Sequence, residues 1–228
     1  MLSPVEIEIL VTSLNVALRA VIWALPFAVL VAFALSRPRF PGKLVLDGLT
    51  HLPIVLPPVL VGFLLLILFG RRGPAGAWLE QTFGVHLAFT MQGAALATSV
   101  MIFPVFVRSI RLAFETGDHS LFEAASVLRA GPLDRFFSIA LPLAWPGILA
   151  GIVMAFATAM GEFGAVITFA ANIPGQTQTL PLAIYAVLQQ PGGEAEALRL
   201  AALSIIAAVI GMAGADVLQR WARRRLAG

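Results

Sequence analysis

Residues 11–35 read VTSLNVALRAVIWALPFAVLVAFAL, a stretch in which Arg19 is the only charged residue. An α-helix needs about 20 mainly apolar residues to cross the hydrocarbon core of a bilayer, so this stretch predicts a transmembrane helix. Residues 49–69, 87–107 and 198–218 meet the same length requirement. Of the 228 residues, 59% are hydrophobic and 12% are charged, whereas about a quarter are charged in a soluble domain. The sequence therefore predicts an all-α integral membrane protein.

A fifth apolar run, residues 142–171, is too long for one straight crossing. Its roughly 30 residues would extend about 45 Å as a helix, against a hydrocarbon core of about 30 Å. We expect a break at Gly161-Glu162-Phe163-Gly164, because glycine weakens a helix interior and a carboxylate avoids hydrocarbon. Residues 176–190 are too few for another span and suit a re-entrant or interfacial helix. The sequence thus predicts five transmembrane helices in a single domain.

Basic residues gather at alternate ends of the predicted spans, and cytoplasmic loops are the ones that collect Lys and Arg. They follow the first, third and last spans, as Arg37, Arg39 and Lys43, then Arg108, Arg111, Arg129 and Arg135, then Arg220, Arg223, Arg224 and Arg225. This distribution predicts an external amino terminus and a cytoplasmic carboxyl terminus. Because the basic residues flank apolar runs and form no continuous face, no nucleic-acid partner is expected.

The predicted cytoplasmic loop, residues 108–141, contains its own helix signal. Ser120 and Glu123 have the spacing of a capping box, in which each side chain satisfies a free backbone amide of the first turn. Apolar residues then recur at helical spacing, and Gly131-Pro132 ends the helix. The apolar stripe consists of Leu121, Ala124, Ala125 and Leu128. The loop therefore presents a short amphipathic helix to the cytoplasm.

Catalytic and nucleotide-binding chemistry has no support in the sequence. The glycine-containing stretch Gly70–Pro74 lacks the lysine and hydroxyl that a phosphate-binding loop requires. The chain has no cysteine, and His51, His86 and His119 are scattered, so neither a metal site nor a catalytic group is indicated. We therefore expect no enzyme activity and no cofactor bound by this chain.

The cytoplasmic loop resembles the EAA loop of permease subunits of ABC importers. The resemblance rests on Glu123-Ala124-Ala125, Gly131 and the Ile139-x-Leu141-Pro142 pattern, with Arg129 where the family usually has glycine. It implies a coupling helix that docks on a separate ATPase subunit, which holds the ATP and magnesium. The coupling residues implied are Ser120, Leu121, Glu123, Ala124, Ala125, Leu128, Arg129 and Gly131.

Most of the chain is similar to the permeases of molybdate importers. The similar stretches are residues 39–43, 51–58, 70–73, 161–165, 172–175 and 191–194. This resemblance implies the type I ABC importer permease fold in the bacterial inner membrane. It also implies a homodimer, two copies of a cytoplasmic ATP-binding subunit and an external substrate-binding protein. Sulfate and tungstate permeases share several of these features and stay open as alternatives.

Three groups of residues are candidates for the translocation path. Prolines remove backbone donors and bend spanning helices, which suits a helix that faces a pathway or one that is bent only for packing. The carboxylate at the predicted break serves either the gate or a hydrogen bond to a neighbouring helix. Two external arginines either steer an oxyanion or form a solvated basic pair. These candidates are Pro53, Pro57 and Pro58, then Glu162, Phe163 and Gly164, then Arg71 and Arg72.

A remote alternative is an ion-coupled secondary transporter. That class predicts paired charges at mid-membrane and an internal repeat, and the sequence displays neither. An ATP-driven importer that moves molybdate by alternating access is therefore the preferred interpretation.

Overall fold

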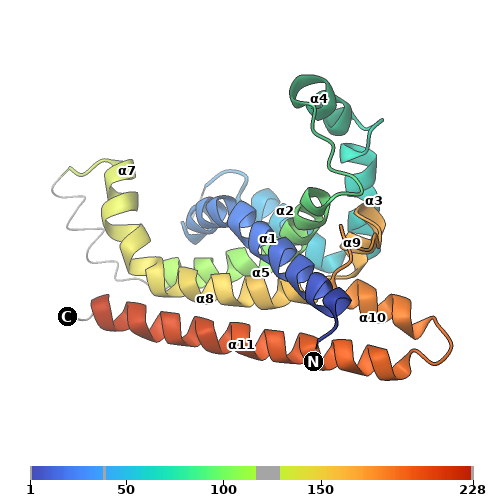
Figure 1. Ribbon diagram of the computed structural model, residues 1–228. Coiled ribbons are helices and arrows are strands. Elements are labelled where there is room, and N and C mark those ends of the chain that lie inside the picture. Colours follow the sequence, from blue (N-terminus) through green and yellow to red (C-terminus); the bar gives the residue numbers. More distant parts are fainter. Residues whose placement is uncertain (1, 38–39, 117–128, 227–228) are drawn as a thin grey trace.

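The computed structural model describes residues 2–37, 40–116 and 129–226, and every element in these residues is helical. Long helices α1 (Pro4–Ser36), α5 (Met91–Glu115), α8 (Leu141–Met160) and α11 (Glu194–Leu226) form the body. Helix α5 packs against α1 and α8, and α8 also packs against α11, as Figure 1 shows. The shorter helices are α2 (Lys43–Val55), α3 (Pro58–Phe69), α4 (Pro74–Phe83), α9 (Gly164–Phe169) and α10 (Leu180–Leu188).

Helix α1 begins with a local signal. The Glu6 N–H donates to Ser3 Oγ at 3.2 Å, and the Ser3 N–H donates to Glu6 Oε2 at 2.7 Å. This reciprocal capping box satisfies two backbone amides, and Pro4 follows at the first helical position, where it loses no helical hydrogen bond. The helix therefore begins at Pro4, seven residues before the predicted span begins at residue 11.

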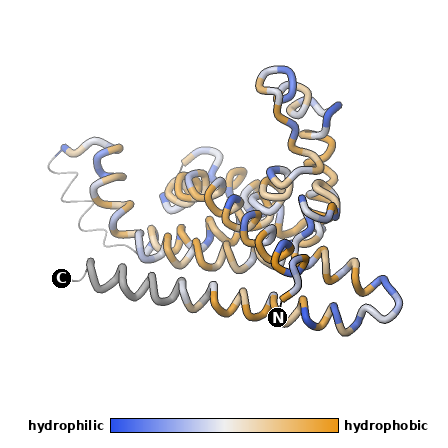
Figure 2. Tube along the Cα trace, viewed as in Figure 1, coloured by the Kyte–Doolittle hydropathy of each residue, from blue (hydrophilic) through white to orange (hydrophobic). Residues whose placement is uncertain are grey.

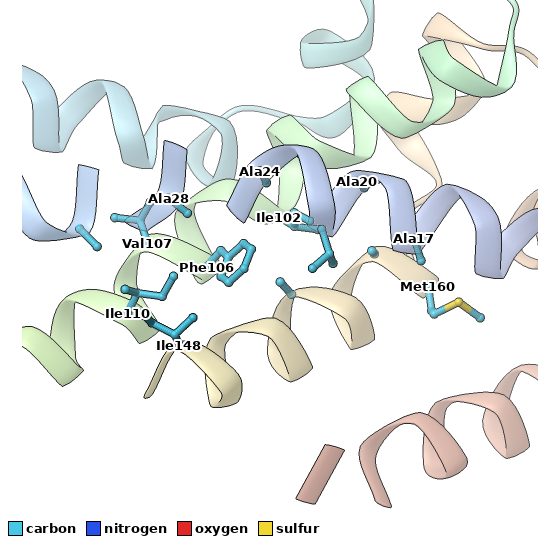
Figure 3. Packing of buried hydrophobic residues seen from close by; sticks show 14 of the residues in the cluster. Ala17, Ala20, Ala24, Ala28, Ile102, Phe106, Val107, Ile110, Ile148 and Met160 are labelled. Atoms are coloured by element: carbon cyan, nitrogen blue, oxygen red, sulfur yellow. The ribbon is translucent and has the colours of Figure 1, made fainter. Parts of the chain in front are cut away.

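Small residues allow α1 and α5 to approach closely. Ala17, Ala20, Ala24 and Ala28 form one stripe on α1 and are 0–4% exposed. Large side chains of α5 fill the space over this stripe, as Figure 3 shows. They include Ile102, Phe106 and Ile110, each fully buried. In lipid, close van der Waals packing of this kind is a principal source of helix association.

Among the described residues, three helical stretches are long and apolar enough to cross a membrane: Pro4–Ser36, Met91–Glu115 and Pro132–Met160. The last one joins α7 (Pro132–Arg135), a π-helical turn η1 (Phe136–Ala140) and α8. Helices α2 and α3 together would be a fourth, although they meet at 113°. Figure 2 shows apolar residues along α1, α5 and α8, with hydrophilic residues gathered on α4 and at the start of α11. The predicted span at residues 198–218 lies inside α11.

The predicted run 49–69 is two helices, α2 and α3, separated at Leu56 and Pro57. Proline lacks an N–H and disfavours helical backbone in the residue before it, so consecutive prolines at 57 and 58 end α2. The expected kink is therefore a 113° bend, and α3, about 18 Å long by helical rise, does not cross a bilayer alone.

The predicted span 87–107 and the predicted loop 108–141 also have different bounds. Thr90 caps α5 by accepting from the Gly93 N–H at 3.1 Å, so the helix begins at Met91. Helix α5 continues to Glu115, and the first described helix after residue 129 begins at Pro132. Helical structure therefore extends into the predicted loop, residues 108–141, from both sides.

Helix α4 is absent from the sequence prediction. Pro74 occupies its first turn and Gly84, at φ 66°, ends it in the left-handed conformation that glycine favours. It lies beyond α3, away from the long helices (Figure 1).

Candidate translocation and coupling sites

The predicted pathway residues Pro58 and Gly164 lie in direct contact, although they are far apart in sequence. A Cβ at Gly164 would lie 2.6 Å from Pro58 Cβ. On the next turn of α3, a Cβ at Gly62 would lie 2.6 Å from the Ala165 carbonyl oxygen. Real Cβ atoms essentially never approach other atoms this closely, so two glycines allow α3 and α9 to pack backbone against backbone. Helices α3 and α9 thus form one close-packed unit.

The bend before α3 is built from the other predicted prolines. Pro53 lies inside α2, and Pro57 occupies the position before the first helical residue of α3. Pro58 stands at the first helical position, where its missing N–H costs no hydrogen bond. Pro57 and Pro58 therefore form the junction at which α2 ends and α3 begins, and Pro53 lies in the last turns of α2.

The Glu162 side chain caps α9. The Ala165 N–H donates to Glu162 Oε1 at 2.9 Å, and the Glu162 N–H donates to the Ala159 carbonyl at 3.2 Å. Helix α8 ends at Met160 and α9 begins at Gly164, so the break occurs in the expected place. Phe163, between them, places its ring centroid 5.0 Å from that of Tyr185 on α10. The Glu162 carboxylate is therefore hydrogen-bonded to the helix that follows it along the chain, and a role in the gate stays a prediction.

Substitution of Glu162 separates its capping role from its charge. Gln keeps a side-chain oxygen that can accept from Ala165, so Glu162→Gln is expected to melt close to the wild-type temperature. Glu162→Leu removes the acceptor and is expected to destabilise the permease by about 0.5–2 kcal/mol. Thermal unfolding of the detergent-solubilised protein measures both. Equal destabilisation of the two variants would contradict the capping role.

The loop between α9 and α10 is fixed by polar contacts that the sequence analysis missed. Thr177 Oγ1 accepts from the Ile173 N–H at 3.0 Å and donates to the Ala171 carbonyl at 2.9 Å. Ser13 on α1 accepts from the Leu180 N–H at 2.7 Å, which ties the loop to the first helix. Ser and Thr among apolar residues were the available signal, but their partners are distant in sequence.

Arg71 and Arg72, the two arginines predicted to face outward, have different surroundings. Arg71 Nε lies 3.6 Å from Glu80 Oε1, and His86 Nδ1 lies 3.5 Å from the same oxygen. Arg72 is exposed and has no ion pair among the described residues. Both arginines occupy the turn between α3 and α4. Glu80 therefore offsets the charge of Arg71, and Arg72 is the freer of the two.

Most of the predicted coupling helix, residues 120–128, lies outside the described residues. At its carboxyl side, Arg129 adopts φ 56° and Gly131 precedes the first residue of α7. A left-handed backbone costs a non-glycine residue about 1–2 kcal/mol. This conformation gives a physical reason for glycine at the Arg129 position in the family pattern.

Replacing Arg129 with glycine is expected to raise stability by up to about 1 kcal/mol, because glycine adopts φ 56° without a Cβ penalty. Arg129→Ala is the matched control, since it removes the same side chain but keeps the Cβ. The melting temperatures of the two purified variants show whether the left-handed backbone at residue 129 lowers stability. A glycine variant that melts below the alanine variant would show that the left-handed backbone is not the dominant effect.

Charged residues join α2 and α5 near the carboxyl end of α5. Arg111 Nη1 lies 3.0 Å from Asp47 Oδ1, and Arg111 Nε lies 2.7 Å from Glu115 Oε1. His51 Nδ1 lies 2.9 Å from the Asp47 carbonyl oxygen. These residues line a pocket of about 730 Å³, together with apolar side chains and Arg108. The sequence analysis gave Asp47 no role.

A second interhelical ion pair joins α1 to α11. Arg199 Nη2 lies 3.0 Å from Glu6 Oε1, so the amino-terminal ends of these two helices are adjacent. Residues that the charge pattern assigns to one side of the membrane are therefore close together in space.

The chain belongs to the family of binding-protein-dependent transport system inner membrane components, whose model matches residues 24–228. It is a multi-pass inner membrane protein and a component of a transport system. Its fold is that of ABC importer permeases. A solved structure of the MetNI methionine ABC transporter in an inward-facing conformation matches 97% of this chain and 99% of the other, with a TM-score of 0.75 and 15% identity.

More similar sequences narrow the comparison. The Molybdenum transport system permease protein ModB of Escherichia coli K12 is 50% identical over 220 residues, which cover 96% of either chain. The protein of that name from Haemophilus influenzae is 46% identical, over 97% of this chain and 95% of its own. A probable sulfate transport system permease protein, cysT, from Nephroselmis olivacea is 34% identical, over 82% of this chain and 66% of its own.

Proposed function

We propose that this chain is the permease subunit of an ATP-driven importer whose substrate is molybdate. The observation that carries the substrate is the 50% identity to a molybdenum permease over nearly the whole of both chains. The sulfate relative is less similar and matches a smaller share of its own length, which favours molybdate over sulfate. Tungstate has the same oxyanion chemistry, so the uptake experiment below includes it as a competitor.

The proposed assembly contains two copies of this chain, two copies of a cytoplasmic ATP-binding subunit and an external substrate-binding protein. Hydrolysis takes place on the ATP-binding subunits, which hold the ATP and magnesium, and this chain binds no cofactor. The coupling segment around Glu123-Ala124-Ala125 docks on the ATP-binding subunit. Support comes from the EAA resemblance and from the extension of α5 and α7 toward this segment.

The proposed orientation places the amino terminus outside and the carboxyl terminus in the cytoplasm. Excess basic charge marks cytoplasmic ends. Two contacts each join residues that the charge pattern assigns to the same side. Glu6 pairs with Arg199 at the end assigned to the outside, and Asp47 pairs with Arg111 at the end assigned to the cytoplasm.

Transport proceeds by alternating access. ATP binding draws the two ATP-binding subunits together, the coupling segments follow, and the two permease chains open outward to receive the oxyanion. Because α3 and α9 are packed backbone against backbone, we infer that they move as one body during this change. Arg72, exposed on the α3–α4 turn, attracts the anion or contacts the binding protein at the outer mouth.

Uptake of labelled molybdate by cells that lack this chain tests the proposal, with and without its restoration. We expect restored uptake that excess tungstate blocks and excess sulfate does not. Loss of sulfate uptake in the cells without the chain, with molybdate uptake unchanged, would keep the permease class and reject the substrate.

A further inference from the structure

The Asp47–Arg111 ion pair joins α5, which leads into the proposed docking segment, to α2, which leads into the α3–α9 unit. Helix α5 ends at Glu115, one turn beyond Arg111, and leads directly into the segment proposed to dock on the ATP-binding subunit. Helix α2 leads through the 113° bend into α3, which packs on α9. Arg111 and Asp47 therefore connect α5, which precedes the proposed docking segment, to α2, which precedes the α3–α9 unit.

Helix α2 has few other means of holding its position. Thr50 is its only buried residue, and its Oγ1 donates to the Leu46 carbonyl within the same helix. Leu44, Val45 and Leu49 are 62–85% exposed. Leu46 is partly buried against the apolar core, and the charged contact with α5 is a second specific link that holds α2 in place.

Arg111 is oriented by two carboxylates. Its Nη1 contacts Asp47 on α2, while its Nε contacts Glu115 one turn along α5, at 3.0 and 2.7 Å. The Glu115 contact holds the guanidinium on α5, so a displacement of α5 carries the guanidinium with it. Its side chain is 28% exposed, and partial burial weakens screening by salt.

We propose that the Asp47–Arg111 ion pair transmits movement of the ATPase-docking segment to α2 and, through the bend, to the α3–α9 unit. The inference rests on the proposed function, because it takes the segment around Glu123-Ala124-Ala125 as the docking segment. As a partly exposed ion pair it contributes little to stability. Its expected importance is for coupling of hydrolysis to transport.

The test uses the complete complex of permease, ATP-binding subunit and binding protein in proteoliposomes. ATP hydrolysis and labelled molybdate uptake are measured together, and copurification of the ATP-binding subunit reports assembly. We expect Asp47→Asn and Arg111→Gln each to raise the ATP consumed per molybdate transported at least fivefold. The double variant is expected to be no worse than either single variant, because both remove one interaction.

Two variants serve as matched controls. Arg199→Gln removes the ion pair with Glu6, which joins α1 and α11 and lies off this route. Glu115→Gln removes the intrahelical partner of Arg111 and keeps Asp47. We expect the ATP-to-molybdate ratio to stay within twofold of wild type for Arg199→Gln, and the change for Glu115→Gln to be smaller than for Asp47→Asn.

Several outcomes would overturn the proposal. A wild-type ratio in both Asp47→Asn and Arg111→Gln would remove the pair from the coupling route. Additive effects in the double variant would show that the two residues act separately. Loss of the ATP-binding subunit on purification of either variant would make the pair an assembly contact. A wild-type complex that transports no molybdate would instead reject the proposed function.

Discussion

Replacing Gly164 with alanine is expected to lower molybdate uptake at least tenfold while the chain remains in the membrane. The added Cβ would lie 2.6 Å from Pro58 Cβ and 3.3 Å from the Val59 backbone nitrogen. Pro58 belongs to the first turn of α3 directly after the bend, and its ring does not rotate away. Relief therefore requires α3 or α9 to move, and overpacking of this kind typically costs about 1–3 kcal/mol.

Gly161→Ala is the matched control, because it lies on the same α8–α9 break. A Cβ at Gly161 would meet only the Thr158 carbonyl oxygen at 3.7 Å, an ordinary contact. Uptake by this variant is expected to stay within twofold of wild type. Uptake assays and immunoblots of membrane fractions separate lost transport from lost insertion. Wild-type uptake by Gly164→Ala would show that the α3–α9 contact is not needed for translocation.

Gly147→Ala is expected to destabilise the packing of α8 against α5, and Ala113→Gly is expected to restore it. The new Cβ would lie 2.1 Å from Ala113 Cβ, the closest side-chain approach of any described glycine. The single variant should lose about 1–3 kcal/mol, with a lower melting temperature and less protein in the membrane. Removing the Ala113 Cβ in the same chain eliminates the clash.

The stability of the Ala113→Gly single variant is the reference for the double variant. Glycine in a helix interior costs about 1 kcal/mol relative to alanine, so the double variant should approach the stability of Ala113→Gly and not of wild type. Melting temperatures of the detergent-solubilised permease for all four chains complete the cycle. A double variant no more stable than Gly147→Ala would mean that the cost at residue 147 comes from another neighbour.

Some local features were predictable and were missed. The Ser3–Glu6 capping box has the same spacing as Ser120–Glu123, which the sequence analysis did recognise. Helix α4 likewise lies between a Gly-Pro start and a glycine end. In both cases the signal depends on neighbouring residues only, so tertiary structure was not needed to find it.

The membrane class, the break at residues 161–164 and the resemblance to importer permeases followed from the sequence alone. Length of apolar run, position of charge and helix-breaking residues act over short distances, so a pattern along the chain records them. The 113° angle at Leu56–Pro57 was decided by tertiary structure, because prolines allow a bend without setting its size. The Gly164–Pro58 and Arg111–Asp47 contacts join distant segments, and only the packing of helix against helix determines which faces meet.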